Sequence, residues 1–211
     1  MIKAIFFDYD GVIVDSFPIV HRVYREICKQ LGKECPEDFS EFKKIYGLNS
    51  RKMLRNLQFS KEDIDKADVL YNSLIRTFQP PLYTGVREVI ITLSKKYALY
   101  VISSSPHSDV QNKLNGFGLS AHFKKIIGGD IGPMSKPAKL LELIESEKLR
   151  KDEIVMVGDR PNDFIDAEKA GIEKVLLVGY GWGYDSTSIP NFRQQIKVNT
   201  PSDIIPAIEA M

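Results

Sequence analysis

The sequence lacks a marked excess of one charge and lacks any long apolar run. Its 29 basic and 28 acidic residues give a net charge of +1, and no basic run of the nucleic-acid-binding type is present. No apolar stretch reaches the roughly 18 residues that a membrane-spanning helix requires. These absences predict a protein with no nucleic-acid partner and no membrane span.

Cysteine is also scarce. Cys28 and Cys35 form neither a C-x-x-C motif nor a set of metal ligands, so we expect two free thiols in a reducing compartment. Met1-Ile2-Lys3 leads directly into an apolar segment, without the basic region, extended apolar core and cleavage site of a secretory signal. Both features predict a cytoplasmic protein.

What is present is typical of a globular chain: 211 residues, 43% hydrophobic and 27% charged. This length allows one large core or a core with a smaller insertion. Residues 4–7 are continuously apolar, as expected for a strand buried on both faces, and from residue 82 onward helical and apolar strand patterns alternate. Residues 17–80 instead show only helical periodicity.

The predicted fold is therefore α/β: a Rossmann-like parallel sheet flanked by helices, with a small all-helical domain inserted after the first strand. We expect residues 1–16 and 82–211 to form the α/β core and residues 17–81 to form the insertion. Four strands of the sheet are predicted after the insertion, at residues 98–102, 125–127, 154–157 and 175–178.

The first strand ends at two carboxylates, Asp8 and Asp10, followed by Gly11. Strand ends of this kind lie at the carboxyl edge of a parallel sheet, where α/β folds place their ligands. Two like charges about 5 Å apart repel by roughly 3 kcal/mol at an effective dielectric constant near 20, so the pair requires a cation or a proton. Taken alone, the same residues are more typical of an ordinary turn than of a catalytic centre.

Further polar residues follow the later strands. Ser103 ends the strand 98–102, Lys136 follows the strand 125–127 after a short loop, and Asp159 and Asp163 follow the strand 154–157. Each alone has an ordinary explanation as a helix cap, a solvated lysine or a turn residue. Together they bring four carboxylates and one ammonium group to one sheet edge, and this excess of negative charge predicts a bound divalent cation. Mg²⁺ fits best, because it prefers a few carboxylates together with water and phosphate oxygens.

The order of these residues carries a family resemblance. Asp8-Tyr9-Asp10-Gly11-Val12-Ile13-Val14-Asp15-Ser16, then Ser103, then Lys136-Pro137, then Gly158-Asp159-Arg160-Pro161-Asn162-Asp163 resemble the four motifs of the haloacid dehalogenase superfamily. The helical insertion after the first motif is similar to the cap domain of the branch that contains phosphoglycolate phosphatase and β-phosphoglucomutase.

The resemblance implies a Mg²⁺-dependent phosphatase of a small phosphorylated metabolite. It implies that Asp8 is the nucleophile, forming an aspartyl phosphate, and that Asp10 is the general acid and base. The implied metal ligands are Asp8, Asp10 through its backbone carbonyl, Asp159 and, through water or in an outer position, Asp163. The residues implied to bind or balance the phosphoryl group are Ser103, Lys136 and backbone N–H groups around Gly11 and Ser104.

Other readings stay open at this point. A phosphosugar mutase of the β-phosphoglucomutase type shares the motifs, and a non-catalytic phospho-receiver or binding module also combines clustered aspartates, a hydroxyl group and a lysine on a parallel sheet. His21 and Arg51 are candidates for substrate contact from the cap, although a packed histidine and a solvated arginine are the more common explanations for such residues. The sequence is compatible with a monomer or a homodimer.

Overall fold

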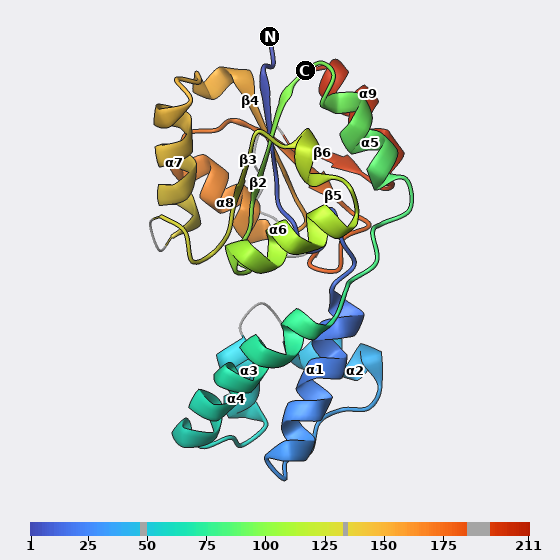
Figure 1. Cartoon of the computed structure of the whole chain (residues 1–211), viewed down its shortest axis with the longest axis vertical. Coiled ribbons are helices and arrows are strands. Elements are labelled where there is room, and N and C mark those ends of the chain that lie inside the picture. Colours follow the sequence, from blue (N-terminus) through green and yellow to red (C-terminus); the bar gives the residue numbers. More distant parts are fainter. Residues whose placement is uncertain (47–49, 133–134, 185–194) are drawn as a thin grey trace. The chain divides into compact units, whose positions relative to one another are not determined.

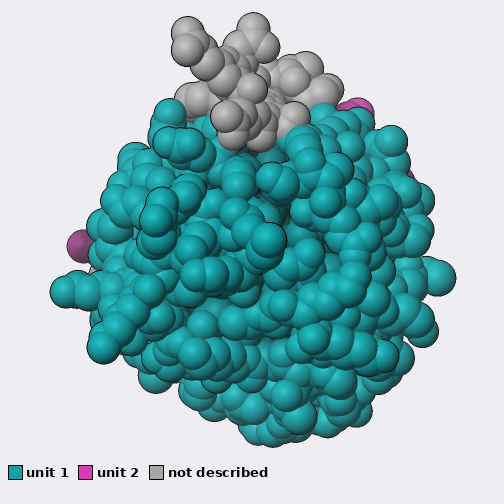
Figure 2. All heavy atoms as spheres, turned by 90° about the horizontal axis from the view of Figure 1, so that it is seen from above, with its two compact units in different colours: residues 1–15, 81–211 teal, residues 16–80 magenta. Residues whose placement is uncertain are grey.

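The computed structural model describes residues 1–46, 50–132, 135–184 and 195–211. These residues divide into two compact units, coloured separately in Figure 2: Met1–Asp15 with Pro81–Met211, and Ser16–Pro80. The first unit is thus built from two segments of the chain and the second from one. Each unit is described by itself.

The first unit contains a six-stranded sheet in the order β3-β2-β1-β4-β5-β6, in which every neighbouring pair is parallel. β1 is central: Phe7 is in register with Val101 of β2 on one side and Val157 of β4 on the other. The strands are β1 (Ala4–Phe7), β2 (Ala98–Ile102), β3 (Lys125–Ile127), β4 (Ile154–Gly158), β5 (Lys174–Val178) and β6 (Gln195–Val198). The predicted parallel α/β architecture is confirmed.

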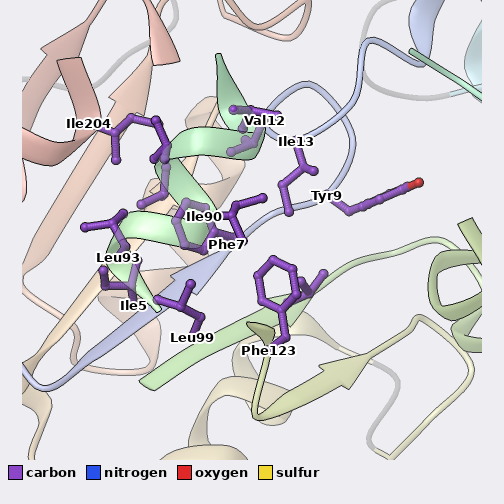
Figure 3. Close-up of a cluster of buried hydrophobic side chains, with 14 of the residues drawn as sticks. Ile5, Phe7, Tyr9, Val12, Ile13, Ile90, Leu93, Leu99, Phe123 and Ile204 are labelled. Atoms are coloured by element: carbon purple, nitrogen blue, oxygen red, sulfur yellow. The ribbon is translucent and has the colours of Figure 1, made fainter. Parts of the chain in front are cut away.

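Helices cover both faces of this sheet (Figure 1). On one face, α5 (Val86–Leu93), α6 (His107–Gly116) and α9 (Ile204–Glu209) pack in one apolar cluster, part of which is drawn in Figure 3. On the other face, α7 (Lys136–Ser146) and α8 (Pro161–Lys169) pack in a second cluster. Short 3₁₀ turns at Ser120–His122, Lys151–Glu153 and Pro201–Asp203 complete the unit.

β1 has no polar position because both of its faces are covered. Ile5 and Phe7 point into the first cluster, whereas Ala4 and Phe6 point into the second, and all four are fully buried. Burying one large apolar side chain contributes about 1.5–3 kcal/mol. The continuous apolar run therefore places β1 at the centre of the sheet, and the next charged residue, Asp8, lies at its carboxyl end.

The second unit is all-helical. It consists of α1 (Phe17–Gln30), α2 (Phe39–Tyr46), α3 (Ser50–Asn56), α4 (Lys61–Leu74) and a 3₁₀ turn at Ile75–Thr77. Ser60 caps α4, and its side chain and that of Asp63 form a capping box. An aromatic cluster joins α1 to α2 and α4, with rings from Phe17, His21, Tyr24, Phe42, Tyr46 and Tyr71.

One helix boundary and one strand differ from what the sequence pattern indicates. An apolar stripe of helical spacing runs from Ile64 to Phe78, but α4 ends at Leu74, because the chain tightens into the 3₁₀ turn and Phe78 is already extended. β6 was not predicted, because its polar side chains give no apolar run. Gly47, where the helical pattern of residues 39–46 is expected to end, and most of the polar stretch after residue 183 lie outside the described residues.

Both cysteines are free thiols. Among the described helices, none is both long enough and apolar enough to span a membrane.

Candidate active site

The predicted site residues of the first unit follow three adjacent strands at the carboxyl edge of the sheet. Asp8 follows β1, Ser103 follows β2 and Asp159 follows β4. The strand ladder extends to two of them: the Asp8 N–H donates to the Val157 carbonyl at 2.9 Å, and the Ser103 N–H donates to the Ile127 carbonyl at 2.9 Å. The sheet itself thus fixes the backbone of these residues.

Lys136 lies between two of the carboxylates. Its Nζ is 3.1 Å from Asp8 Oδ2 and 2.5 Å from Asp163 Oδ1, and all three side chains are nearly excluded from solvent. Lys136 is the first residue of α7, where the Ser135 side chain accepts the Ala138 N–H and caps the helix. The helix start therefore aims the ammonium group at the carboxyl edge of the sheet.

Both oxygens of Asp163 already accept hydrogen bonds. Its Oδ2 accepts the backbone N–H groups of Asp159 at 3.2 Å and Arg160 at 3.1 Å, and its Oδ1 accepts from Lys136. Burial acts to raise the pKa of Asp163, but Lys136, together with the charge and backbone N–H of Arg160, outweighs it and lowers the pKa. Because three donors already bind its oxygens, Asp163 fits a position outside the direct ligands of a cation better than direct contact with it.

Asp8 has fewer partners. Its Oδ1 accepts the Tyr9 N–H at 2.8 Å, and Lys136 lies beside its Oδ2. Burial raises the pKa of Asp8 to about 7, although Lys136 opposes the shift, because desolvation disfavours the carboxylate. A cation would restore the charged form.

Asp159 is fully buried and is held by the glycine-rich loop after β5. Its Oδ2 accepts the Gly183 N–H at 2.7 Å. Its Oδ1 has no hydrogen-bond partner in the described part of the chain, and the Arg160 guanidinium, which stacks on Trp182, lies 3.8 Å away. Burial raises the pKa of Asp159 well above its usual range. Asp159 Oδ1 is buried and accepts no hydrogen bond from the described residues, and this is the observation that most favours a bound cation.

Only a glycine at position 11 allows the backbone to pack this closely against Asp159. Its φ is +81°, and a Cβ there would lie 1.9 Å from Asp159 Oδ2. The Gly11 N–H, which belongs to the amides predicted to hold a phosphoryl oxygen, donates to the Val14 carbonyl at 2.9 Å in this structure. The close packing of Gly11 on Asp159 is thus the role that the geometry displays.

The donor set fits a hard divalent cation. Asp8, Asp159 and Asp163 each offer a carboxylate oxygen, and these oxygens lie within 4.8 Å of one another. Only Lys136 and Arg160 lie near enough to be ion-paired with them among the described residues. Buried oxygen ligands with an excess of negative charge are what Mg²⁺ prefers.

Asp10 stands apart from this cluster. Its Oδ2 accepts the hydroxyl hydrogen of Ser105 at 2.7 Å, and the Ser105 N–H donates to Ser103 Oγ at 3.0 Å. Ser104, between them, is exposed. Ser105 was missed in the sequence, where the only signal was its place two residues beyond Ser103, the spacing at which a serine side chain can accept a backbone N–H in a turn.

His21 and Arg51 both have partners within the helical unit. His21 is buried, stacks on Phe42 with ring centroids 4.6 Å apart, and has its Nε2 2.9 Å from the Pro36 carbonyl. Arg51 is exposed and forms an ion pair with Asp68 at 2.5 Å. Their predicted contact with substrate stays a prediction.

A comparison with protein families decides the classification. The model of the family described as haloacid dehalogenase-like hydrolase matches residues 5–177, which span all four motifs. The chain belongs to the haloacid dehalogenase-like hydrolase family.

Relatives of this haloacid dehalogenase-like hydrolase align over most of its length. It is 28% identical to a phosphorylated carbohydrates phosphatase from Thermotoga maritima, covering 83% of this chain and 85% of that protein. It is 26% identical to a phosphoglycolate phosphatase from Photobacterium profundum, covering 97% and 91%. A haloacid dehalogenase-like hydrolase from Streptococcus pneumoniae has the same fold, with a TM-score of 0.87 at 23% identity and 98% of both chains covered.

The site of this family member is distinct from a cavity of about 480 Å³ over the outer edge of β3. That cavity is lined by residues of α6, β3 and α7, among them His107, Ile126 and Leu143, and by none of the carboxylates described above. The chemistry of the described residues is therefore concentrated at the ends of β1, β2 and β4.

Proposed function

We propose that this hydrolase is a Mg²⁺-dependent phosphatase that hydrolyses a small phosphorylated metabolite through an aspartyl phosphate on Asp8. The observation that carries the proposal is the division of the carboxylates. Asp8 is buried beside Lys136, whereas the Asp10 carboxylate is tethered outside that cluster by Ser105. One carboxylate is thus placed to attack and a separate one to move protons.

In the first step, a carboxylate oxygen of Asp8 attacks phosphorus and the bond to the leaving oxygen breaks. Asp10, protonated, gives its proton to that leaving oxygen, so that an alcohol departs. In the second step, Asp10 takes a proton from water, the water oxygen attacks phosphorus, and Asp8 is released as a carboxylate together with inorganic phosphate. Asp10 thus acts as the general acid in the first step and as the general base in the second.

Charge balance comes from the residues around Asp8. Lys136 offsets negative charge on the phosphoryl oxygens and keeps Asp8 oriented. The Ser103 oxygen accepts a hydrogen bond from the Ser105 N–H. Its own hydroxyl hydrogen can therefore be donated to a phosphoryl oxygen. Asp8, Asp159 and the Asp10 carbonyl would hold Mg²⁺, with Asp163 in an outer position. The bound cation supplies charge stabilisation of the phosphoryl group.

The test is phosphate release from 4-nitrophenyl phosphate. The wild type should turn over with Mg²⁺ and stop in EDTA, and Asp8→Asn should lose at least about 1000-fold in kcat. Asp10→Asn should accumulate a phosphoryl group on the Asp8 peptide after rapid acid quench, because the base for the second step is missing. Glu168→Gln, an exposed carboxylate on α8, is the matched control. Undiminished turnover by Asp8→Asn would refute the proposal.

We further propose that the helical unit acts as a cap that selects the substrate. The names of the two relatives suggest phosphoglycolate and phosphorylated carbohydrates as the first substrates to assay. Arg51→Ala should change the relative kcat/KM values among these substrates, whereas Arg55→Ala, also exposed on α3, should not. A requirement for a sugar bisphosphate without phosphate release would instead identify a phosphosugar mutase.

A further inference from the structure

Ser105 contacts both partners of the proposed chemistry but has no role in it so far. Its hydroxyl donates to Asp10 Oδ2 at 2.7 Å, and its backbone N–H donates to Ser103 Oγ at 3.0 Å. Ser103 is the proposed phosphoryl-binding hydroxyl and Asp10 the proposed acid and base. A single residue therefore connects the group that would hold the phosphate to the group that would move the proton.

The tether leaves Asp10 with one defined oxygen for chemistry. A serine hydroxyl has one hydrogen, and in this structure that hydrogen is directed to Oδ2. Oδ1 is then the oxygen that can exchange a proton with a leaving group or with water. A carboxylate without such a donor would rotate among several orientations, and proton transfer requires a defined one.

Ser105 is itself held by a second loop, residues 128–131. The Gly129 N–H donates to the Ser105 carbonyl at 2.8 Å. Gly129 packs so closely on the serine loop that a Cβ there would lie 2.2 Å from the Ser104 carbonyl oxygen. The serine loop therefore cannot shift toward Gly129 without a clash.

That second loop is in turn held by hydrogen bonds from Lys139. The side chain of Lys139 is buried, and its ammonium group donates to the carbonyls of Gly128 at 3.0 Å, Gly129 at 3.1 Å and Ile131. Asp130 of the same loop accepts the His107 N–H at 2.6 Å. The support for Ser105 thus extends into the buried part of α7, which is the arrangement expected of a residue whose position matters.

We propose that Ser105 is a positioning residue that orients the Asp10 carboxylate for proton transfer to the leaving oxygen. This inference rests on the proposed function. It separates Ser105 from Ser103, which would bind the phosphoryl group directly. It also gives a consequence that depends on the leaving group, because only a poor leaving group needs the proton.

The test compares two substrates in Ser105→Ala. 4-Nitrophenolate departs without protonation near neutral pH, whereas the alkoxide of glycerol 2-phosphate does not. We expect kcat/KM, which covers only the steps up to departure of the leaving group, to fall at least about 10-fold for glycerol 2-phosphate and no more than about 2-fold for 4-nitrophenyl phosphate. Ser105→Thr, which keeps the hydroxyl, should restore the ratio. Ser108→Ala, exposed on α6, is the matched control.

Equal losses on the two substrates would overturn the inference, because a general loss of structure lowers both. A crystal structure of Ser105→Ala provides a readout that does not depend on activity: Asp10 should leave its wild-type rotamer or occupy several. An unchanged, single Asp10 rotamer would also overturn it. If the wild type hydrolysed neither phosphate while Asp10 became disordered in Ser105→Ala, the proposed function would fail and the positioning contact would stand.

Discussion

At the scale of single residues, carboxylates close in space are given different properties by their hydrogen-bond donors. Asp8 and Asp163 both lie beside Lys136. Asp163 also accepts two backbone N–H groups, and its pKa is lowered, whereas Asp8 accepts one and its pKa is raised by burial to about 7. Asp163 therefore acts as a fixed anion that holds Lys136, and Asp8 keeps lone pairs for a ligand or a substrate.

Glu147 offers a pH-dependent test away from the site. It accepts from Tyr100 at 2.9 Å, Lys124 at 2.5 Å and Lys125 at 2.5 Å, and the hydrogen bonds from the two lysines have the largest effect and lower its pKa to about 2. Since the usual value is 4.5, the stabilisation is fully present above about pH 4.5 and is lost as the pH falls toward 2.

Glu147→Gln should therefore lower the free energy of unfolding at pH 7 by about 1–2 kcal/mol, a value reduced from the full linkage because both lysines are largely exposed. The difference from the wild type should shrink in urea titrations below pH 4. Glu145→Gln, an exposed carboxylate in the last turn of α7 just before Glu147, should show no such pH-dependent difference. A gap that stayed constant from pH 7 to pH 3 would contradict the assigned partners.

At the scale of elements, the loop after β5 is shaped by its contact with the site. Tyr180 Oη donates to the Val12 carbonyl at 3.0 Å, and Gly183 donates to Asp159. Between them, a Cβ at Gly181 would lie 2.2 Å from Asp159 Cβ and 2.5 Å from the Gly11 carbonyl oxygen. The loop can pass over Asp159 only without a side chain at this position.

Gly181→Ala should destabilise the protein by about 2 kcal/mol or more in urea unfolding, because the contacts are with groups that cannot move away cheaply. Gly118→Ala is a useful comparison: that glycine has a φ of +68° but open space around it. Its cost should be limited to backbone strain of about 1 kcal/mol. Equal costs at the two positions would mean that the loop can withdraw from Asp159.

Strands that are continuous apolar runs could be predicted from the sequence, whereas elements and residues defined by tertiary contacts could not. β1, β2 and β4 are apolar runs ending at a polar residue, so both the strands and their convergent ends follow from the sequence. β6, with the sequence Gln-Ile-Lys-Val, is an edge strand that needs no continuous apolar face. Ser105 was overlooked because its importance lies in a hydrogen bond to a residue 95 positions away.

At the scale of the whole molecule, the carboxyl edge of the sheet stores unfavourable charge that a cation would relieve. Asp8 and Asp159 both have raised pKa values, chiefly through burial, and the nearby charges of Asp163 and Asp8 raise the pKa of Asp159 further. When folding raises the pKa of a carboxyl group, the free energy of unfolding falls as the pH rises from the ordinary pKa through the raised one, because the buried group must then ionise. At neutral pH without metal, the fold therefore carries a penalty at this site.

Binding of Mg²⁺ to the folded state alone should convert this penalty into a stability gain, by about 2.7 kcal/mol when the free ion is at 100 times its Kd. For a chain of this size, 1 kcal/mol corresponds to about 2–4 °C in Tm. The wild type should therefore melt several degrees higher in Mg²⁺ than in EDTA at matched ionic strength, in differential scanning calorimetry.

Carboxylate variants should sort by position in this measurement. Asp159→Asn should abolish most of the Mg²⁺-dependent shift and should melt higher than the wild type in EDTA, because it removes a buried charge. Asp10→Asn and Glu168→Gln should keep the shift, because the Asp10 carboxylate is bound to Ser105 outside the cluster and Glu168 is exposed. A full shift in Asp159→Asn, or its loss in Asp10→Asn, would place the cation elsewhere and would reverse the proposed division between the carboxylates that hold the metal and the one that moves protons.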